Sequence, residues 1–253
     1  MSRVTVELVD RVLCVTIDNV PRKNALTMTM YDDLSAALER AEDDRAVHVV
    51  LLTGAGGQFC SGNDVGGFPP DPAQNGPTPV LRFVTALVQD SVPIVAAVEG
   101  VAAGLGATML LHLDSVVAAR NARIVFPFVN LALAPEAGST QLLPQLLGYT
   151  RAAELILRGG SVDGAEAHRL GIASQLAEPG AALHQALAIA GEMAAKPPQA
   201  MRRAKRLLKG DTAAMMARIH LEERALFDGF ASAEAREAMR AFREKRPPDF
   251  SNC

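Results

Sequence analysis

The sequence predicts an α/β fold, because short apolar runs alternate with stretches of helical periodicity. The three clearest runs lie at 47–54, 93–100 and 114–120, and each ends at a turn or a polar residue. Short runs without polar alternation are typical of strands that are buried on both faces. With 253 residues and 49% hydrophobic content, the chain can bury a full core in one large domain or two small ones.

The N-terminus predicts a β-hairpin. Apolar and polar residues alternate from Val4 to Ile17, with a break at Val9–Arg11 where we expect the turn. The segment lacks the long apolar core of a signal peptide, and no stretch of the sequence is long enough to span a bilayer. We therefore expect a cytoplasmic protein without membrane contact.

Residues 27–42 predict the first helix. Thr29 is placed to cap its N-terminus, with Asp32 three residues later as in a capping box. The apolar positions that we expect to face the core are Leu34, Leu38 and Ala41.

Beyond about residue 185 the sequence becomes helical and charged, without a further clear strand. We therefore expect an α/β core at 1–195 and a helical C-terminal module at 196–253. In the basic run 202–209 we expect the charged side chains to be solvated. The expected buried side of this helix consists of Ala204, Leu207 and Leu208.

Composition and missing motifs exclude several classes of function. The net charge is −3 and the basic residues are spread along the chain, which disfavours nucleic-acid binding. The three cysteines are odd in number and widely spaced, so neither a disulfide framework nor a zinc cluster is expected. The histidines show no metal-ligand spacing, and we expect no metal site. Dinucleotide, Walker, nucleophile-elbow and zinc-protease motifs are absent.

Two glycine-containing turns follow predicted strands, FCSGND at 59–64 and VAAGLGAT at 101–108. Strand ends of this kind are where α/β folds place ligands. A turn of small residues that opens a helix leaves backbone N–H groups available for an anion. If the two turns face each other, the N–H groups of Asn63 and Leu105 could bind one oxyanion. The alternative is a pair of ordinary tight turns.

The first turn is followed by residues 66–79, which are crowded with proline and glycine and cannot form a regular element. Loops of this length in compact domains are usually either disordered or active-site flaps. We expect this segment to be an active-site flap.

Glu136, within APEAGST at 134–140, is a single carboxylate among small residues. An acidic residue after a proline at the start of a helix can simply complement the helix dipole. A catalytic role is the other possibility. Apolar neighbours would raise its pKa and a helix dipole would lower it, so the sequence leaves the net direction open.

Four motifs in this order and spacing resemble the crotonase superfamily of enoyl-CoA hydratases and isomerases. They are FCSGND, AAVEGVAAGLGA, PEAGSTQLLPQLLG and KPPQAMRRAKRLL. The resemblance runs from PRKNAL (21–26) to AFREKRPPDF (241–250), nearly the whole chain. It implies a spiral of ββα units with a C-terminal helical trimerisation module, and acyl-CoA substrates. No cofactor is implied, because coenzyme A is part of the substrate.

The resemblance also assigns roles to residues. The backbone N–H groups of Asn63 and Leu105 would hold the thioester carbonyl, although Leu105 stands where glycine is commoner. The two glutamates that activate water in family hydratases fall on Thr108 and Phe128, which cannot transfer protons at neutral pH. Glu136 stands where the isomerase branch has its catalytic glutamate. It would remove a proton from C2 of a 3-enoyl thioester and return it at C4.

By the same resemblance, Lys23 would face a CoA phosphate and Ala25 would give main-chain contacts. Phe242 and Lys245 would contact the adenine and phosphate end, with a solvated helix end as the alternative for Lys245. The other expected substrate contacts are Ser61, Gly62, Asp64, Gly104 and Phe128.

We therefore predict a Δ3,Δ2-enoyl-CoA isomerase that forms a homotrimer or a dimer of trimers, with Glu136 as its single proton shuttle. One alternative is an enoyl-CoA hydratase or another lyase or hydrolase of this family. The other is a non-catalytic acyl-CoA-binding or RNA-binding protein with the same fold.

Overall fold

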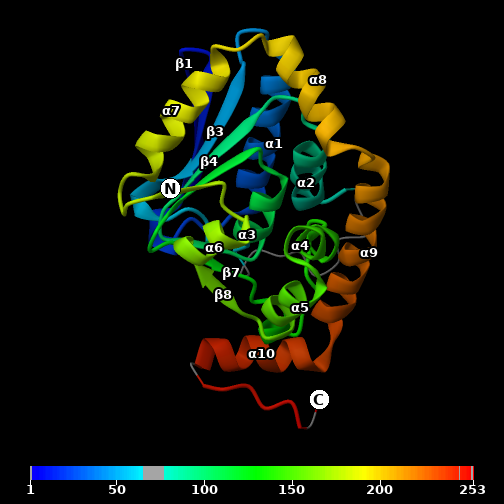
Figure 1. Ribbon diagram of the computed structural model, residues 1–253. Helices are drawn as coiled ribbons and strands as arrows, with labels where there is room; N and C mark the ends of the chain where they lie inside the picture. Colours follow the sequence, from blue (N-terminus) through cyan, green and yellow to red (C-terminus); the bar gives the residue numbers. More distant parts are fainter. Residues whose placement is uncertain (1, 65–76, 245, 252) are drawn as a thin grey trace.

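The structure, a computed structural model, describes residues 2–64, 77–244, 246–251 and 253 (Figure 1). Of Phe242 it describes only the backbone. The segment expected to be a flap therefore lies outside the described residues, apart from 77–79.

A six-stranded sheet forms the centre of the molecule, in the order β1-β2-β3-β4-β6-β9. Only the pair β1–β2 is antiparallel. Its two-residue turn, Asp10–Arg11, has φ of 47° and 69°, the positive values that match the twist of a hairpin. The predicted hairpin and buried strands are confirmed. The strands are β1 (Arg3–Val9), β2 (Val12–Asp18), β3 (Val49–Gly54), β4 (Ile94–Val98), β6 (Ser115–Ala119) and β9 (Gln175–Ala177).

A second, smaller sheet consists of β5 (Val101–Ala103), β7 (Arg123–Val125) and β8 (Ser161–Asp163). Two isolated β-bridges, Leu26–Asn63 and Cys60–Ala102, extend this smaller sheet with residues from the preceding loops. Successive units thus place one strand in each layer, β4 then β5 and β6 then β7. This arrangement confirms the predicted α/β spiral of ββα units.

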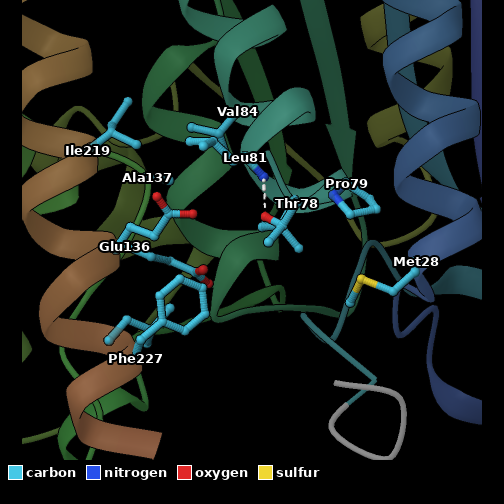
Figure 2. Close-up of a pocket in the computed structure, with 12 residues that line it drawn as sticks. Met28, Thr78, Pro79, Leu81, Val84, Glu136, Ala137, Ile219 and Phe227 are labelled. Atoms are coloured by element: carbon cyan, nitrogen blue, oxygen red, sulfur yellow. Dashed lines mark hydrogen bonds between the residues drawn. The ribbon is translucent and has the colours of Figure 1, made fainter. Parts of the chain in front are cut away.

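Helices cover both faces of the large sheet. Figure 1 shows α7 on one side of β3 and β4 and α1 on the other. Helix α9 packs along α2, and a cavity lies between these two helices (Figure 2). No described helix has the length and apolar character that a membrane crossing requires. The helices are α1 (Met28–Asp43), α2 (Pro79–Gln89), α3 (Leu105–Thr108), α4 (Ser139–Leu147), α5 (Tyr149–Leu157), α6 (Gly164–Leu170), α7 (Ala182–Ala194), α8 (Pro198–Lys209), α9 (Thr212–Ala231) and α10 (Ala233–Glu244).

The division into a core at 1–195 and a module at 196–253 stays a prediction. Helix α7 ends at Ala194 and packs on the large sheet. The helices beyond it also contact the core, α9 through α2 and α10 through the short helix η6 (Phe128–Leu131).

Helix α1 begins earlier than predicted. Thr27, not Thr29, is the N-cap, and its hydroxyl oxygen accepts a hydrogen bond from the Met30 N–H at 3.3 Å. The cause is the preceding residue, because the Leu26 N–H donates to the Gly62 carbonyl and holds the chain extended up to that point. The predicted apolar stripe is confirmed, with Leu34, Leu38 and Ala41 buried.

The burial prediction for α8 is wrong. Arg202 and Lys205 are only 8% and 4% exposed, whereas Leu207 and Leu208 are 83% and 87% exposed. Ala204 is exposed as well. The helix therefore turns Arg202 and Lys205 toward the core, where they find acidic and carbonyl partners.

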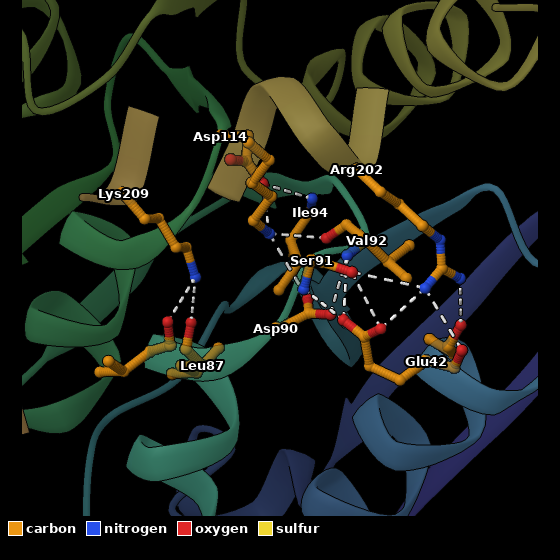
Figure 3. Close-up of polar contacts among 12 residues, drawn as sticks. Glu42, Leu87, Asp90, Ser91, Val92, Ile94, Asp114, Arg202 and Lys209 are labelled. Atoms are coloured by element: carbon orange, nitrogen blue, oxygen red, sulfur yellow. Dashed lines mark hydrogen bonds and ion pairs between the residues drawn. The ribbon is translucent and has the colours of Figure 1, made fainter. Parts of the chain in front are cut away.

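These partners form a network between α8, the end of α1 and the loop before β4 (Figure 3). Lys205 Nζ lies 2.8 Å from Asp114 Oδ2 and 2.6 Å from the Val92 carbonyl oxygen. Arg202 donates to the Glu42 carboxylate at 2.7 Å and to the Ala41 carbonyl at 2.9 Å. Buried cations require such partners, because an unpaired charge in the interior is costly.

Replacement of Lys205 by methionine should destabilise the protein by about 3 kcal/mol, because the Asp114 carboxylate and the Val92 carbonyl lose their cation. Urea unfolding at neutral pH measures the loss. The matched control is Arg203→Met, an exposed cation on the same helix, for which we expect a change within about 0.5 kcal/mol. Equal effects of the two substitutions would contradict a structural role for the network.

Candidate active site

The two glycine-containing turns lie against each other, an arrangement that the sequence left open beside a pair of ordinary tight turns. Gly62 has a φ of 91°, and a Cβ atom there would lie 2.7 Å from the Ala103 carbonyl oxygen and 3.7 Å from the Gly104 Cα. A side chain at residue 62 would therefore be strained and would also push the turns apart. The backbones meet directly at this point.

This packing leaves two N–H groups available. The Leu26–Asn63 bridge uses the Gly62 carbonyl and the Asp64 N–H, so the N–H of Asn63 itself points away from Leu26. Leu105 is the first residue of α3, and an N–H in the first helical turn has no acceptor within its helix. Neither N–H takes part in a hydrogen bond within the part of the chain that the structure describes.

The side chain of Asn63 has a separate partner. Its Oδ1 atom accepts a hydrogen bond from the hydroxyl of Tyr31, a buried residue of α1. The pKa of Tyr31 is raised well above its ordinary value by burial, and the negative charge of Glu136 adds to the rise. The Asn63 side chain is thus tied to α1 rather than to the space in front of its own N–H.

Glu136 does not cap the helix that follows it. Helix α4 begins at Ser139 after Gly138, and its N-terminus is covered by Glu222 of α9. The Glu222 carboxylate accepts hydrogen bonds from the Gly138 N–H at 2.6 Å and the Thr140 N–H at 2.9 Å, and from the Thr140 hydroxyl. Glu222 lies 84 residues beyond Gly138, so no local pattern could have indicated it.

The Glu136 carboxylate is consequently unpaired in the interior. The residue is only 7% exposed, and no hydrogen bond to its side chain exists among the described residues. Burial raises its pKa to about 8, and the negative charge of Glu222 contributes to the rise. A carboxyl with a pKa near the working pH can both accept and return a proton.

The backbone next to Glu136 is held in an unusual conformation. Ala137 has a φ of 59°, which is uncommon for a residue with a side chain. His112 Nε2 lies 2.7 Å from the Ala137 carbonyl oxygen, and burial lowers the pKa of His112 to about 4. The neutral imidazole therefore donates to this carbonyl. Together with Glu222 it fixes the segment that carries Glu136, in keeping with backbone strain at functional sites.

Glu136 faces an apolar cavity of about 110 Å³. Figure 2 shows its carboxylate directed into the space between Leu81 and Thr78 of the α2 end and Phe227 of α9. The other residues around the cavity are Met28, Pro79, Val80, Val84, Ala137, Ile219, Glu223 and Leu226.

Glu136 is also electrostatically coupled to the first turn. Burial raises the pKa of the Cys60 thiol to about 12, and the charge of Glu136 adds to this rise against the opposing Gly62 N–H hydrogen bond. Cys60 directly precedes Ser61 and Gly62. The unpaired carboxylate is thus close enough to the first turn for its charge to act there.

Several predicted substrate contacts lie along this turn and are bonded to the loop at 22–26. The Ser61 N–H donates to the Lys23 carbonyl at 3.0 Å, and the Ser61 hydroxyl donates to the Arg22 carbonyl at 3.0 Å. Asp64 forms an ion pair with Arg22 at 2.6 Å. The predicted CoA loop and the first turn are therefore one connected unit, with the Lys23 side chain exposed.

The main chain of Ala25 is already engaged, since its N–H donates to the Arg22 carbonyl and its carbonyl accepts from the Asn19 side chain. Its predicted contact with CoA would use the second lone pair of that carbonyl. Lys245 and the Phe242 side chain lie outside the described residues.

The two positions that would carry the hydratase glutamates are both buried and not acidic. The Thr108 hydroxyl donates to the Gly104 carbonyl at 3.3 Å, and Phe128 packs in the core. Within the described residues, no group of three or more His, Cys, Asp or Glu side chains could hold a metal ion.

Comparison with known proteins identifies the family. The family model described as enoyl-CoA hydratase/isomerase matches residues 7–252. The chain belongs to the enoyl-CoA hydratase/isomerase family. Its membership confirms the predicted resemblance to the crotonase superfamily.

Relatives within the enoyl-CoA hydratase/isomerase family carry both kinds of name. The chain is 34% identical to 1,2-epoxyphenylacetyl-CoA isomerase of Escherichia coli over 95% of each chain. It is 33% identical to 2,3-dehydroadipyl-CoA hydratase of the same organism over 99% of each. A crystal structure of an enoyl-CoA hydratase/isomerase from Pseudoalteromonas atlantica is 38% identical and superposes with a TM-score of 0.93, covering 98% of this chain and 99% of that one.

The substitution Glu136→Gln should make the protein more stable than wild type at about pH 8. Burial holds the folded-state pKa of Glu136 near 8, above the ordinary value of 4.5. Protonation of Glu136 stabilises the folded wild type, and this contribution is full below the unfolded-state pKa. It is lost as the pH rises through the folded-state pKa, because the unfolded chain releases its proton at lower pH. The amide has no proton to release. Urea midpoints measured from about pH 5 to about pH 9 should therefore diverge in favour of the variant.

A role of Glu136 in dipole capping gives the opposite result. The variant would then be less stable by about 0.3–1 kcal/mol once the wild-type carboxylate is ionised.

Proposed function

We propose that this protein is a Δ3,Δ2-enoyl-CoA isomerase in which Glu136 is the single proton shuttle. The observation that carries the proposal is the state of this carboxylate, which is buried, without a hydrogen-bond donor among the described residues, and at the wall of an apolar cavity. Such a placement costs stability and serves no capping purpose, since Glu222 covers the N-terminus of α4.

The proposed reaction uses three groups of the site. The thioester carbonyl oxygen accepts hydrogen bonds from the backbone N–H groups of Asn63 and Leu105, which makes the C2 proton more acidic. Glu136 removes that proton, and the two N–H groups stabilise the negative charge of the dienolate on oxygen. The same carboxyl returns the proton at C4, so the double bond moves from C3–C4 to C2–C3. No second residue has to transfer a proton.

The chemistry at Thr108 and Phe128 supports isomerisation over hydration. Addition of water to a 2-enoyl thioester needs a group that deprotonates the water, and neither side chain can do so at neutral pH. Relatives are named as an enoyl-CoA delta isomerase and as a 2,3-dehydroadipyl-CoA hydratase, so hydration by Glu136 alone is the alternative that the same assay measures.

The remaining expectations belong to this proposal. The chain would act in the cytoplasm as a homotrimer or a dimer of trimers, with Phe242 and Lys245 at the CoA adenine and phosphates. It would need no cofactor besides the coenzyme A of its substrate.

Replacement of Glu136 by glutamine should lower kcat on a 3-enoyl-CoA by about 10²–10⁴-fold, the range for loss of one general base. Affinity for acyl-CoA should change little, since the amide keeps the size of the side chain. Steady-state isomerisation of 3-enoyl-CoA, with hydration of 2-enoyl-CoA measured in parallel, tests the assignment.

Isomerisation of 3-enoyl-CoA by Glu136→Gln at the wild-type rate would refute the assignment of Glu136 as the base. In the wild type, kcat/KM should rise with pH and level off above about 8, because only the ionised carboxylate accepts a proton. A fall across the same range would indicate that the protonated form of Glu136 is the active one.

The substitution Asn63→Ala should leave kcat within a few-fold of wild type, because the proposed hydrogen bond to substrate comes from the backbone. The variant should lose about 1–3 kcal/mol of stability, since the buried Tyr31 hydroxyl loses its acceptor. A loss of about 10²–10³ in kcat would instead make the Asn63 side chain the donor. Kinetics and urea unfolding of one preparation give both values.

A further inference from the structure

Helix α9 presents one stripe of side chains to the cavity. Ile219, Glu223, Leu226 and Phe227 are spaced by three, four and seven or eight positions, so they share one face of the helix. Three of them are apolar, like the wall that α2 contributes. Glu223 breaks this pattern with a carboxylate.

The structure shows no packing role for the Glu223 carboxylate. Its side chain is 23% exposed, and its one ion-pair contact among the described residues is with His220, at 3.7 Å from Nδ1 to Oε2. No hydrogen bond in the described part of the chain uses it. The adjacent Glu222, by contrast, is buried and makes three hydrogen bonds to the start of α4.

Glu223 also belongs to a different element from the proposed base. The negative charge that acts on Glu136 comes from Glu222, which does not line the cavity. Glu223 enters the cavity from α9, whereas Glu136 enters it from the loop before α4. The charge of Glu223 therefore acts on whatever part of a ligand fills the cavity along α9.

We propose that Glu223 is a specificity-determining residue that selects against acyl chains ending in a carboxylate and tolerates chains ending in a methyl group or a hydroxyl. The proposal rests on the proposed function only in that the cavity holds the acyl group. A terminal carboxylate would meet a like charge between apolar walls, where repulsion is poorly screened. A terminal hydroxyl could instead donate a charge-assisted hydrogen bond to Glu223.

Equilibrium binding of saturated acyl-CoAs tests the proposal without turnover. Hexanoyl-, octanoyl- and decanoyl-CoA would be compared by calorimetry with their terminal hydroxyl and terminal carboxylate counterparts, on wild type and Glu223→Gln. The matched control is Asp228→Asn, which makes the same charge change at an exposed position of α9 that does not line the cavity.

For at least one chain length, wild type should bind the carboxylate-ended ligand about tenfold or more weakly than the methyl-ended one, a difference of about 1.4 kcal/mol. Glu223→Gln should remove most of this difference and weaken binding of the hydroxyl-ended ligand, whereas Asp228→Asn should keep the wild-type pattern. The same discrimination in Glu223→Gln as in wild type, or no discrimination in wild type at any length, would overturn the proposal.

The experiments can refute the role of Glu223 and the proposed isomerase function independently of each other. If Glu223→Gln loses the selectivity but wild type does not isomerise 3-enoyl-CoA, the proposed function is wrong and the role of Glu223 stands. If wild type isomerises 3-enoyl-CoA and the selectivity does not depend on Glu223, the reverse holds.

Discussion

Close contact between two backbones is the constraint on which the candidate site depends. Gly62 lies against the Ala103–Gly104 peptide, and a Cβ on Gly106 would lie 2.3 Å from the Cys60 carbonyl oxygen. The spiral of ββα units produces this contact, because each unit adds a short strand or bridge beside that of the preceding unit. The N–H groups of Asn63 and Leu105 are therefore positioned by main-chain packing, and the side chains at these positions are free to serve other purposes, as the Asn63–Tyr31 hydrogen bond illustrates.

The environment of Glu136 is built from three distant segments. His112 follows α3 and fixes the Ala137 carbonyl, Glu222 comes from α9, and Leu81 and Val84 of α2 form the apolar wall. Burial and the nearby Glu222 charge both raise the pKa of Glu136, so the same groups that fix its position also tune its chemistry. The cost of an unpaired buried carboxyl is offset by the hydrogen bonds that hold the loop around it.

The sequence predicted those parts of the molecule that depend on local pattern. Buried strands, the hairpin and the two glycine-containing turns follow from apolar runs and glycine placement, whereas the contact between the two turns was only one of two possibilities. The direction of the pKa shift at Glu136 was not predictable, because it depends first on burial among α2 and α9 and then on the charge of Glu222, all remote in sequence. The prediction of which face of α8 is buried was wrong for a related reason. Arg202 and Lys205 find acceptors in three distant segments, namely α1, the loop between α2 and β4, and the segment before β6. The cap of α1 was misplaced because a bridge at Leu26 fixes the preceding residues. In each case contacts with residues distant in sequence overrode the local signal.

The hydrogen bonds from Gly138 and Thr140 to Glu222 have a consequence for the order of events during synthesis. Everything that forms the two turns lies in the first half of the chain, whereas the carboxylate that secures the Glu136 loop belongs to one of the last helices. A ribosome-bound chain can pair its strands long before α9 emerges. The loop that carries Glu136 acquires its final hydrogen bonds only after α9 has been synthesised. Enzymatic competence thus depends on α9 as well as on the folded sheet.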